Sequence, residues 1–178
     1  ETLTEECPVV GGGGYTGFEH HLYRIEIADT ATPRFKWSQW NGGLVGRGRF
    51  DATVNPNRVY IDAGRSAILN SGLTEFYLEA LSYDVLAGTW QVVYGAIATI
   101  NTDHDLELAA PPVSGALPAT ADPVFFRLWN GIAEIADFTN AADPVELRDG
   151  IRLVFDAPAA GNYRAGDHWV FPVRAGEI

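Results

Sequence analysis

The sequence predicts an all-β fold, a sandwich or barrel-like domain of short, mostly antiparallel strands with few or no helices. Three observations predict it. Apolar and polar side chains alternate over short segments, turn-forming residues interrupt these segments about every ten positions, and no helical period is sustained. Short strands at this spacing are typical of β-sandwiches and β-barrels.

The segment 18–28, FEHHLYRIEIA, shows the two-residue period, because Tyr23, Ile25 and Ile27 alternate with other side chains. Later segments are separated by turn sequences such as NGG and NPN. Residues 66–73 lack the period and predict a single helical turn, and residues 111–123 contain four prolines and predict a loop. The other expected strands are 34–40, 43–50, 57–62, 75–85, 89–100, 106–109, 124–131, 133–138, 145–155 and 163–173.

A length of 178 residues fits one domain with a substantial core. Residues 1–14 contain four consecutive glycines and are expected to form a flexible N-terminal tether, so the single all-β domain is expected over 15–178. Cys7 is the only cysteine, which excludes an internal disulfide. No methionine is present, even at position 1, so we expect the chain to be a piece of a larger protein.

The charge of the chain limits its partners. A formal net charge of −11 repels nucleic-acid phosphates and anionic membranes, so no nucleic acid is expected as a partner. No run of about 18 apolar residues occurs, so no membrane insertion is expected. A composition with one lysine and many acidic residues suits an extracellular or particle-associated location.

Two groups of residues are candidate metal ligands. His20 and His21 are neighbours that a strand would place on opposite faces, which favours a structural or solvent-exposed role. The acidic segment NTDHDLE places Asn101, Asp103 and Asp105 at alternate positions, as Ca²⁺ ligands sometimes are. Leu106 stands where an EF-hand loop needs glycine, so a solvated hairpin tip is the other interpretation. Apart from possible Ca²⁺, no cofactor is expected.

The sequence singles out no catalytic residue. No serine lies in a Gly-x-Ser-x-Gly turn, and the lone cysteine lies in the expected tether. With 23 acidic residues, a carboxylate pair for glycoside hydrolysis is possible, but no two acids are distinguished by their surroundings.

The aromatic residues provide the candidate binding site. Four tryptophans lie within alternating apolar runs and are expected in the core: Trp37, Trp90, Trp129 and Trp169. The fifth, Trp40, shares its expected strand face with polar residues and precedes a turn, so we expect it to be exposed. An exposed tryptophan can stack a sugar or grip a protein, and nearby polar groups can orient the ligand. The expected ligand-binding residues are Trp40, Lys36, Gln39 and Asn41.

Four motifs spread over most of the chain carry a resemblance to a known family. They are YTGFEHHLYRIEI, FKWSQWNGG, FRLWNGI and LRDGIRLVF followed by GNYRAGDHWVFPVRAG. Together they resemble a bacterial domain of unknown function found in large modular proteins, with a YxGLENxLYRVEI, FKWSRxNG, WDG, DGI and YRxGDYWxxPAR pattern. Matching positions include Tyr15, Gly17, Glu19, Tyr23, Arg24, Lys36, Trp37, Asn41, Trp129, Asp149, Gly150, Tyr163, Arg164, Asp167, Trp169 and Pro172.

The resemblance implies a structural or adhesive role. Such domains are found in phage-tail-like particles, contractile injection systems and secreted surface proteins, and no catalytic activity is implied. Trp40 takes a position that is usually polar or acidic in the family, which again predicts an exposed side chain.

Three hypotheses follow for the function. The first is a non-catalytic binding module of a larger extracellular or phage-tail-like protein, which binds carbohydrate through exposed aromatic residues. The alternative is a structural or oligomerising packing module of a tail or fibre, whose partners are neighbouring modules. The third is a polysaccharide-active enzyme.

Overall fold

The chain is all-β, as the sequence predicts, and its contacts gather in two compact units. The computed structural model describes residues 15–17, 19–51, 53–119, 123–156 and 163–174. We call residues 42–131 the barrel unit, and the described residues before and after them the sheet unit. The expected tether, 1–14, lies outside the described residues, and the expectation of one domain over 15–178 stays a prediction.

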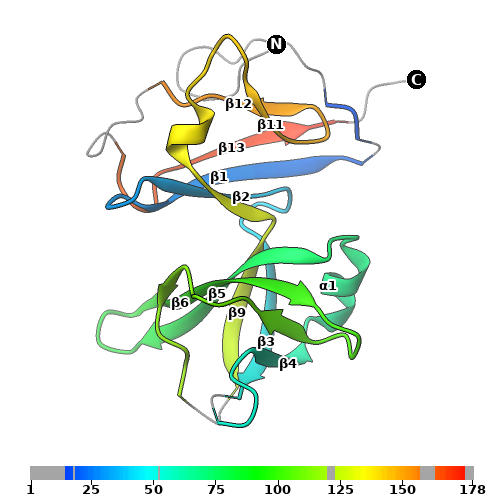
Figure 1. Ribbon diagram of the computed structural model, residues 1–178, viewed down its shortest axis with the longest axis vertical. Coiled ribbons are helices and arrows are strands. Elements are labelled where there is room, and N and C mark those ends of the chain that lie inside the picture. The colour runs from blue at the N-terminus through cyan, green and yellow to red at the C-terminus, as the bar shows by residue number, and fades with distance from the viewer. Residues whose placement is uncertain (1–14, 18, 52, 120–122, 157–162, 175–178) are drawn as a thin grey trace. The chain divides into compact units, whose positions relative to one another are not determined.

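Six strands of the barrel unit close into an antiparallel barrel in the order β5, β9, β3, β4, β7, β6 and back to β5 (Figure 1). A two-stranded pairing adds β8 to β6. The single predicted helical turn is confirmed as α1. The elements are β3 (Leu44–Phe50), β4 (Arg58–Ala63), α1 (Arg65–Asn70), β5 (Glu75–Asp84), β6 (Thr89–Ile100), β7 (Leu106–Leu108), β8 (Ser114–Gly115) and β9 (Val124–Trp129).

The barrel core is built from one face of each strand. On β9, Phe126 and Leu128 point inward and are fully buried, while the preceding residue, Phe125, points outward. The ring of Phe126 lies over Gly46 of β3, where an added Cβ would collide with it. Because Gly46 has no side chain, it leaves room for the large Phe126 ring inside this small barrel.

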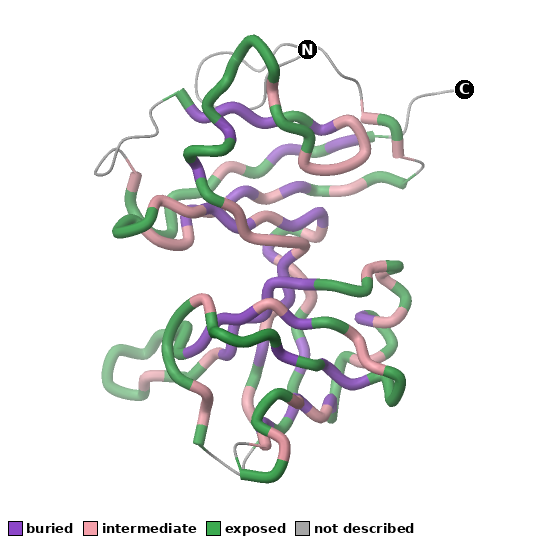
Figure 2. The backbone as a smooth tube through the Cα atoms, in the orientation of Figure 1, coloured by how far each residue is buried: buried purple, intermediate pink, exposed green. Residues whose placement is uncertain are grey.

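The sheet unit contains a four-stranded sheet in the order β10, β2, β1, β13, in which β1 is antiparallel to β2 and to β13, together with a separate hairpin of β11 and β12. Buried side chains from the sheet and the hairpin form one hydrophobic cluster. The buried residues are the purple parts of the backbone tube in Figure 2. The elements are β1 (His21–Asp29), β2 (Arg34–Ser38), β10 (Gly131–Glu134), the 3₁₀ helix η1 (Ile135–Phe138), β11 (Val145–Arg148), β12 (Ile151–Leu153) and β13 (His168–Val173).

The expected strand at 133–138 is wrong in its second half. β10 ends at Glu134, and residues 135–138 form η1. Ile135 and Phe138 are both buried in the core of the sheet unit. Side chains three apart share a face on a 3₁₀ helix but point to opposite faces on a strand, so burial of both favours the helix.

β13 is an edge strand, and its proline faces outward. The N–H of Ile27 donates to the carbonyl of Asp167 at 2.9 Å. This bond shows that Ile27 and every second residue of β1 before it form hydrogen-bonded pairs with β13. Because such pairs alternate, Leu22 and Pro172 form a pair without hydrogen bonds, and the nitrogen of Pro172 points away from β1. The outer edge of the sheet therefore lacks one N–H group at this position.

Candidate functional site

The residues expected to surround Trp40 are mostly buried. Lys36 on β2 is 5% exposed, and its Nζ lies 3.0 Å from Oε1 of Glu26. Gln39 is also 5% exposed, whereas Asn41 is exposed. Lys36 and Gln39 therefore offer little surface to a ligand, and their expected role in binding stays a prediction. Lys36 is buried because its charge is paired with a carboxylate inside the same sheet.

Trp40 is half-buried and packs within the sheet unit. The indole ring of Trp40 lies edge-on to the ring of His21, with centroids 6.5 Å apart. The backbone N–H of Trp40 donates to Oγ of Ser38 at 3.0 Å. β2 ends at Ser38, so Trp40 lies beyond the strand and the two-residue period does not apply to it. The expectation of an exposed Trp40 is corrected to a half-buried one, and its role in binding stays a prediction.

Glu26 forms a compact charge cluster with two basic residues. Its Oε2 lies 2.6 Å from Nη2 of Arg24, and Lys36 contacts its other oxygen. Burial raises the pKa of Glu26, but the charges and hydrogen bonds of Lys36 and Arg24 outweigh burial, so the pKa lies below its ordinary value. The contact between Glu26 and Lys36 links β1 to β2, while Arg24 contacts Glu26 within β1.

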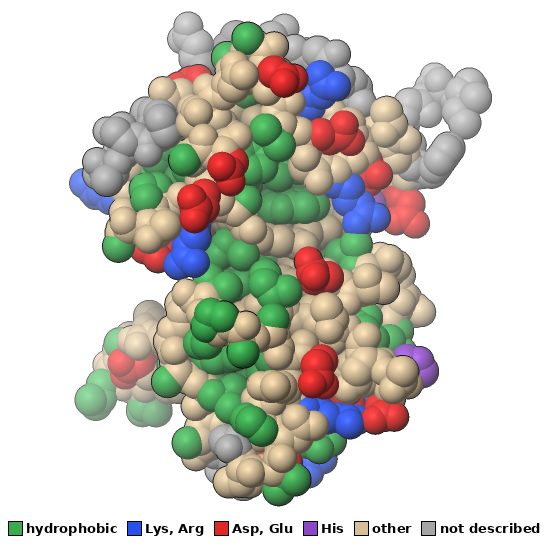
Figure 3. Space-filling view, in the orientation of Figure 1, with side chains coloured by type: hydrophobic (Ala, Val, Ile, Leu, Met, Phe, Trp, Pro, Cys, Tyr) green, Lys and Arg blue, Asp and Glu red, His purple; other side chains and the backbone are tan. Residues whose placement is uncertain are grey.

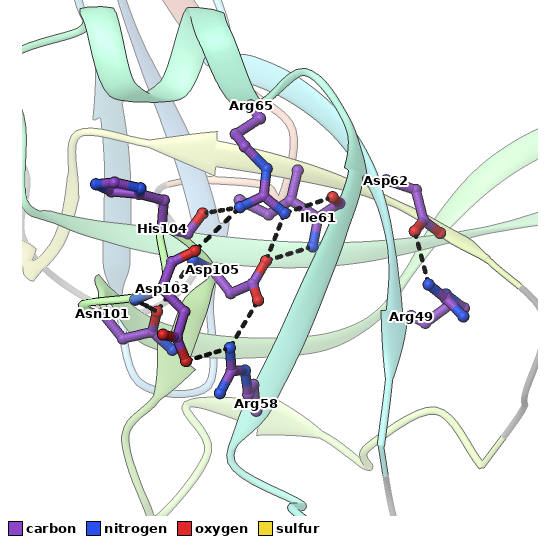
Figure 4. A network of polar contacts seen from close by, with 9 residues as sticks. All are labelled: Arg49, Arg58, Ile61, Asp62, Arg65, Asn101, Asp103, His104 and Asp105. Atoms are coloured by element: carbon purple, nitrogen blue, oxygen red, sulfur yellow. Dashed lines mark hydrogen bonds and ion pairs between the residues drawn. The ribbon is translucent and has the colours of Figure 1, made fainter.

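The three candidate Ca²⁺ ligands form a hairpin tip joined to two arginines (Figure 4). Oδ1 of Asn101 accepts the N–H groups of Asp103 and Asp105, each at 3.0 Å, which closes the turn. Arg58 donates 2.8 Å hydrogen bonds to the carboxylates of both Asp103 and Asp105. The guanidinium group of Arg58 competes with a Ca²⁺ ion for both carboxylates, so these contacts favour the hairpin-tip interpretation over the candidate Ca²⁺ site.

Asp105 is the buried centre of this network. Its Oδ1 accepts from the N–H of Ile61 at 3.0 Å and from Nη2 of Arg65 at 2.8 Å, and its Oδ2 accepts from Arg58. Burial raises the pKa of Asp105, but the hydrogen bonds and charges around it outweigh burial and lower the pKa overall. Within the described ranges, no group of three or more His, Cys, Asp or Glu side chains could hold a metal ion.

We expect acid to destabilise the fold through these paired carboxylates. Glu26 and Asp105 have lowered pKa values when folded, so the unfolded chain binds protons first as the pH falls. The free energy of unfolding should be constant above about pH 5 and should fall as the pH drops below about 4, near the ordinary carboxyl values. Urea unfolding between pH 3 and pH 7 measures it. Asp105→Asn should flatten the acid limb, and an unchanged pH profile in this variant would contradict the assignment.

The outer face of the barrel carries an exposed aromatic strip, which we define as Leu81, Tyr83, Trp90, Val92 and Phe125. Exposed fractions are 49% for Tyr83, 54% for Trp90 and 42% for Phe125. The ring centroids of Tyr83 and Trp90 are 5.3 Å apart, as are those of Trp90 and Phe125. Exposure of three neighbouring aromatic rings is unusual for a protein surface and makes this strip the candidate site.

Strand register brings these residues together. Tyr83 lies directly opposite Trp90 in the β5–β6 hairpin, and Leu81 lies opposite both Val92 on β6 and Phe125 on β9. Side chains that lie opposite each other share a face, so all five point outward from the barrel. The hairpin extends beyond the barrel body to an exposed tip, where hydrophobic side chains are visible in Figure 3.

Two shallow hollows flank the centre of the strip. One, of about 250 Å³, is lined by Val45, Leu81, Trp90, Phe125 and Arg127. The other, of about 430 Å³, shares Leu81, Trp90 and Phe125 with the first and continues toward Tyr83 and the prolines before β9. The three shared residues therefore form a ridge between two largely apolar hollows.

The sequence interpretation missed this site because it expected Trp90 in the core. The pattern around Trp90 does show one apolar and one polar face, since Tyr83 and Trp90 alternate with Ser82 and Gln91. Whether Trp90 is buried depends on how far along the β5–β6 hairpin the barrel extends. The pairing of β5 with β9 and of β6 with β7 sets that limit. The sequence did contain one indication of this site. Tyr83 and Trp90 lie at equal distances from the same turn, so a hairpin places them opposite each other.

Comparison with protein-family models, with curated proteins and with solved structures finds no match to this chain. The resemblance to a domain of modular bacterial proteins therefore stays a prediction. Among the described residues, no helix has the length and apolar character needed to cross a membrane.

Proposed function

We propose that this chain is a non-catalytic packing module of a larger extracellular or particle-borne assembly, and that it contacts another protein surface through the aromatic strip. The observation that carries the proposal is the exposure of Tyr83, Trp90 and Phe125 on a barrel whose core is already complete. Aromatic residues and arginine are the side chains that supply most of the binding energy at protein interfaces.

Ring geometry favours a protein over a sugar as the ligand. The planes of Tyr83 and Trp90 are inclined at 58°, and those of Trp90 and Phe125 at 77°. A sugar stacks the C–H face of its ring on one aromatic ring, and a chain of sugars stacks best on rings that share a plane, whereas inclined rings make a ridge that fits between side chains of another protein. Val92 in the strip and Val45 beside it are both exposed, so the apolar surface is larger than the three rings alone, which supports protein contact.

Carbohydrate remains a second candidate, favoured by one observation. Arg127 lines the smaller hollow beside Trp90 and Phe125, so a hydrogen-bond donor stands next to two exposed rings. Such a combination can hold a sugar.

Footprinting of Trp90 in the complete protein that carries this chain tests the packing role. Hydroxyl radicals should modify Trp90 readily in the dilute chain, and at least about fivefold more slowly in the assembly, because an interface core excludes water. Trp40, half-buried in the sheet unit, is the internal reference. Equal modification of Trp90 in both samples would overturn the proposal.

A glycan panel separates the second candidate from the first. The packing role predicts no glycan binding by the natural chain, by Trp90→Ala or by Trp40→Ala. Binding that is lost only in folded Trp90→Ala would establish a carbohydrate site on the strip, whereas loss only in Trp40→Ala would restore the site expected from the sequence.

A further inference from the structure

The aromatic strip has chemically different ends. Arg47 on β3 lies opposite Phe125 in the register and is exposed, and it forms no ion pair within the described part of the chain. Tyr83 and Trp90 lie at the other end, on the β5–β6 hairpin. One end therefore presents a cation, and the other presents electron-rich rings, which attract cations over their faces.

Resting on the proposed function, we infer that the partner of the strip is a second copy of this chain, bound across a two-fold axis near Leu81 and Phe125. A two-fold axis through the middle of the strip reverses its direction in the second copy. Arg47 of each copy then lies against Tyr83 and Trp90 of the other, and the same contact forms twice.

The relief of the surface fits the same arrangement. The ridge of Leu81, Trp90 and Phe125 has an apolar hollow on either side. When two copies meet in opposite directions, Leu81 and Phe125 meet their counterparts near the axis, and the Trp90 ring of each copy can enter a hollow of the other, which gives the interlocking that stable interfaces require. A partner of another shape would not need a hollow on both sides of the ridge.

Charge sets the conditions under which the dimer forms. The chain has a net charge of −11, so two copies repel each other at low ionic strength. At 0.15 M salt the Debye length is about 8 Å, which screens most of this repulsion. The direct contact of arginine with aromatic rings in the interface is short-ranged and is screened much less.

Sedimentation velocity at 0.15 M salt, with the natural chain and two matched variants, tests the pairing. Arg47→Gln should weaken dimerisation roughly tenfold by removing the cation from both symmetric contacts. Arg49→Gln changes the net charge equally on the same strand, but Arg49 pairs with Asp62 at 3.1 Å, so its effect should be within about twofold. Equal effects of the two variants, or a monomer at all concentrations, would overturn the inference.

Cross-linking tests the symmetry of the dimer. In a Cys7→Ser background, Leu81→Cys places a thiol beside the two-fold axis and should give a disulfide-linked dimer on mild oxidation. Val45→Cys places a thiol at the end of the strip, away from its own counterpart, and should not. A link through Val45→Cys alone, or a ladder of larger species, would show a different contact and overturn the inference.

These outcomes are separable from the proposed function. If the isolated chain is a monomer while Trp90 is protected in the complete protein, the strip still contacts protein and only the second copy is excluded. If Trp90 is unprotected in the complete protein, the proposed function fails regardless of the behaviour of the isolated chain.

Discussion

Asp105→Ala is expected to lower the free energy of unfolding of the barrel unit by about 3 kcal/mol. Removing this carboxylate leaves the guanidinium groups of Arg58 and Arg65 without their buried acceptor, and the N–H of Ile61 without a partner. The side chain of Asp105 is nearly inaccessible, so water cannot easily replace it. Urea unfolding followed by circular dichroism at pH 7 measures the change.

Asp103→Ala is the matched control for this prediction. Asp103 receives a hydrogen bond from the same Nη2 atom of Arg58 at the same 2.8 Å, but its side chain is largely exposed. An exposed ion pair contributes less than about 1 kcal/mol, so this variant should be nearly as stable as the natural protein. Equal losses in the two variants would show that burial does not set the strength of this network.

Phe126→Ala is expected to lower the free energy of unfolding of the barrel unit by about 4 kcal/mol, because it empties the middle of the barrel. Phe126 is fully buried and fills the space above Gly46 and Gly48. The adjacent Phe125→Ala, on the outer face, should cost less than about 1 kcal/mol in the dilute chain. Denaturant unfolding of both variants makes the comparison, and a larger loss for Phe125→Ala would contradict the inward orientation of Phe126.

A double-mutant cycle locates the contact behind this effect. Gly46→Ala alone should cost about 2 kcal/mol, because its Cβ would meet the Phe126 ring and the strands cannot separate without losing hydrogen bonds. Phe126→Leu in the same molecule should recover part of that loss, since the smaller side chain leaves room for the methyl group. Additive losses would mean that the ring and Gly46 do not touch.

The fold was predictable where a pattern needs only local information. Tyr23, Ile25 and Ile27 are buried in alternation along β1 because one face of that strand packs on the core and the other does not. The single strand expected over 145–155 is wrong, because Asp149 and Gly150 adopt positive φ angles and close a hairpin between β11 and β12. These features depend on backbone geometry within a few residues.

The candidate site was less predictable because its surroundings come from distant segments. Asp105 accepts a hydrogen bond from Arg58, which lies 47 positions earlier, and local spacing, which made Asp105 a candidate Ca²⁺ ligand at a hairpin tip, could not reveal this contact. Lys36 is buried by pairing with Glu26 on another strand. Trp90 is exposed because the β5–β6 hairpin extends beyond the barrel. The length of this extension depends on where β9 and β7 pair with β5 and β6.

The outward-facing proline of β13 limits how this protein can aggregate. A free sheet edge can template the addition of strands from other molecules, the step from which amyloid-like fibres grow. Pro172 offers no N–H to an incoming strand and places its ring in the path of that strand. The sheet unit is thereby less able to add strands from other molecules along its β13 edge.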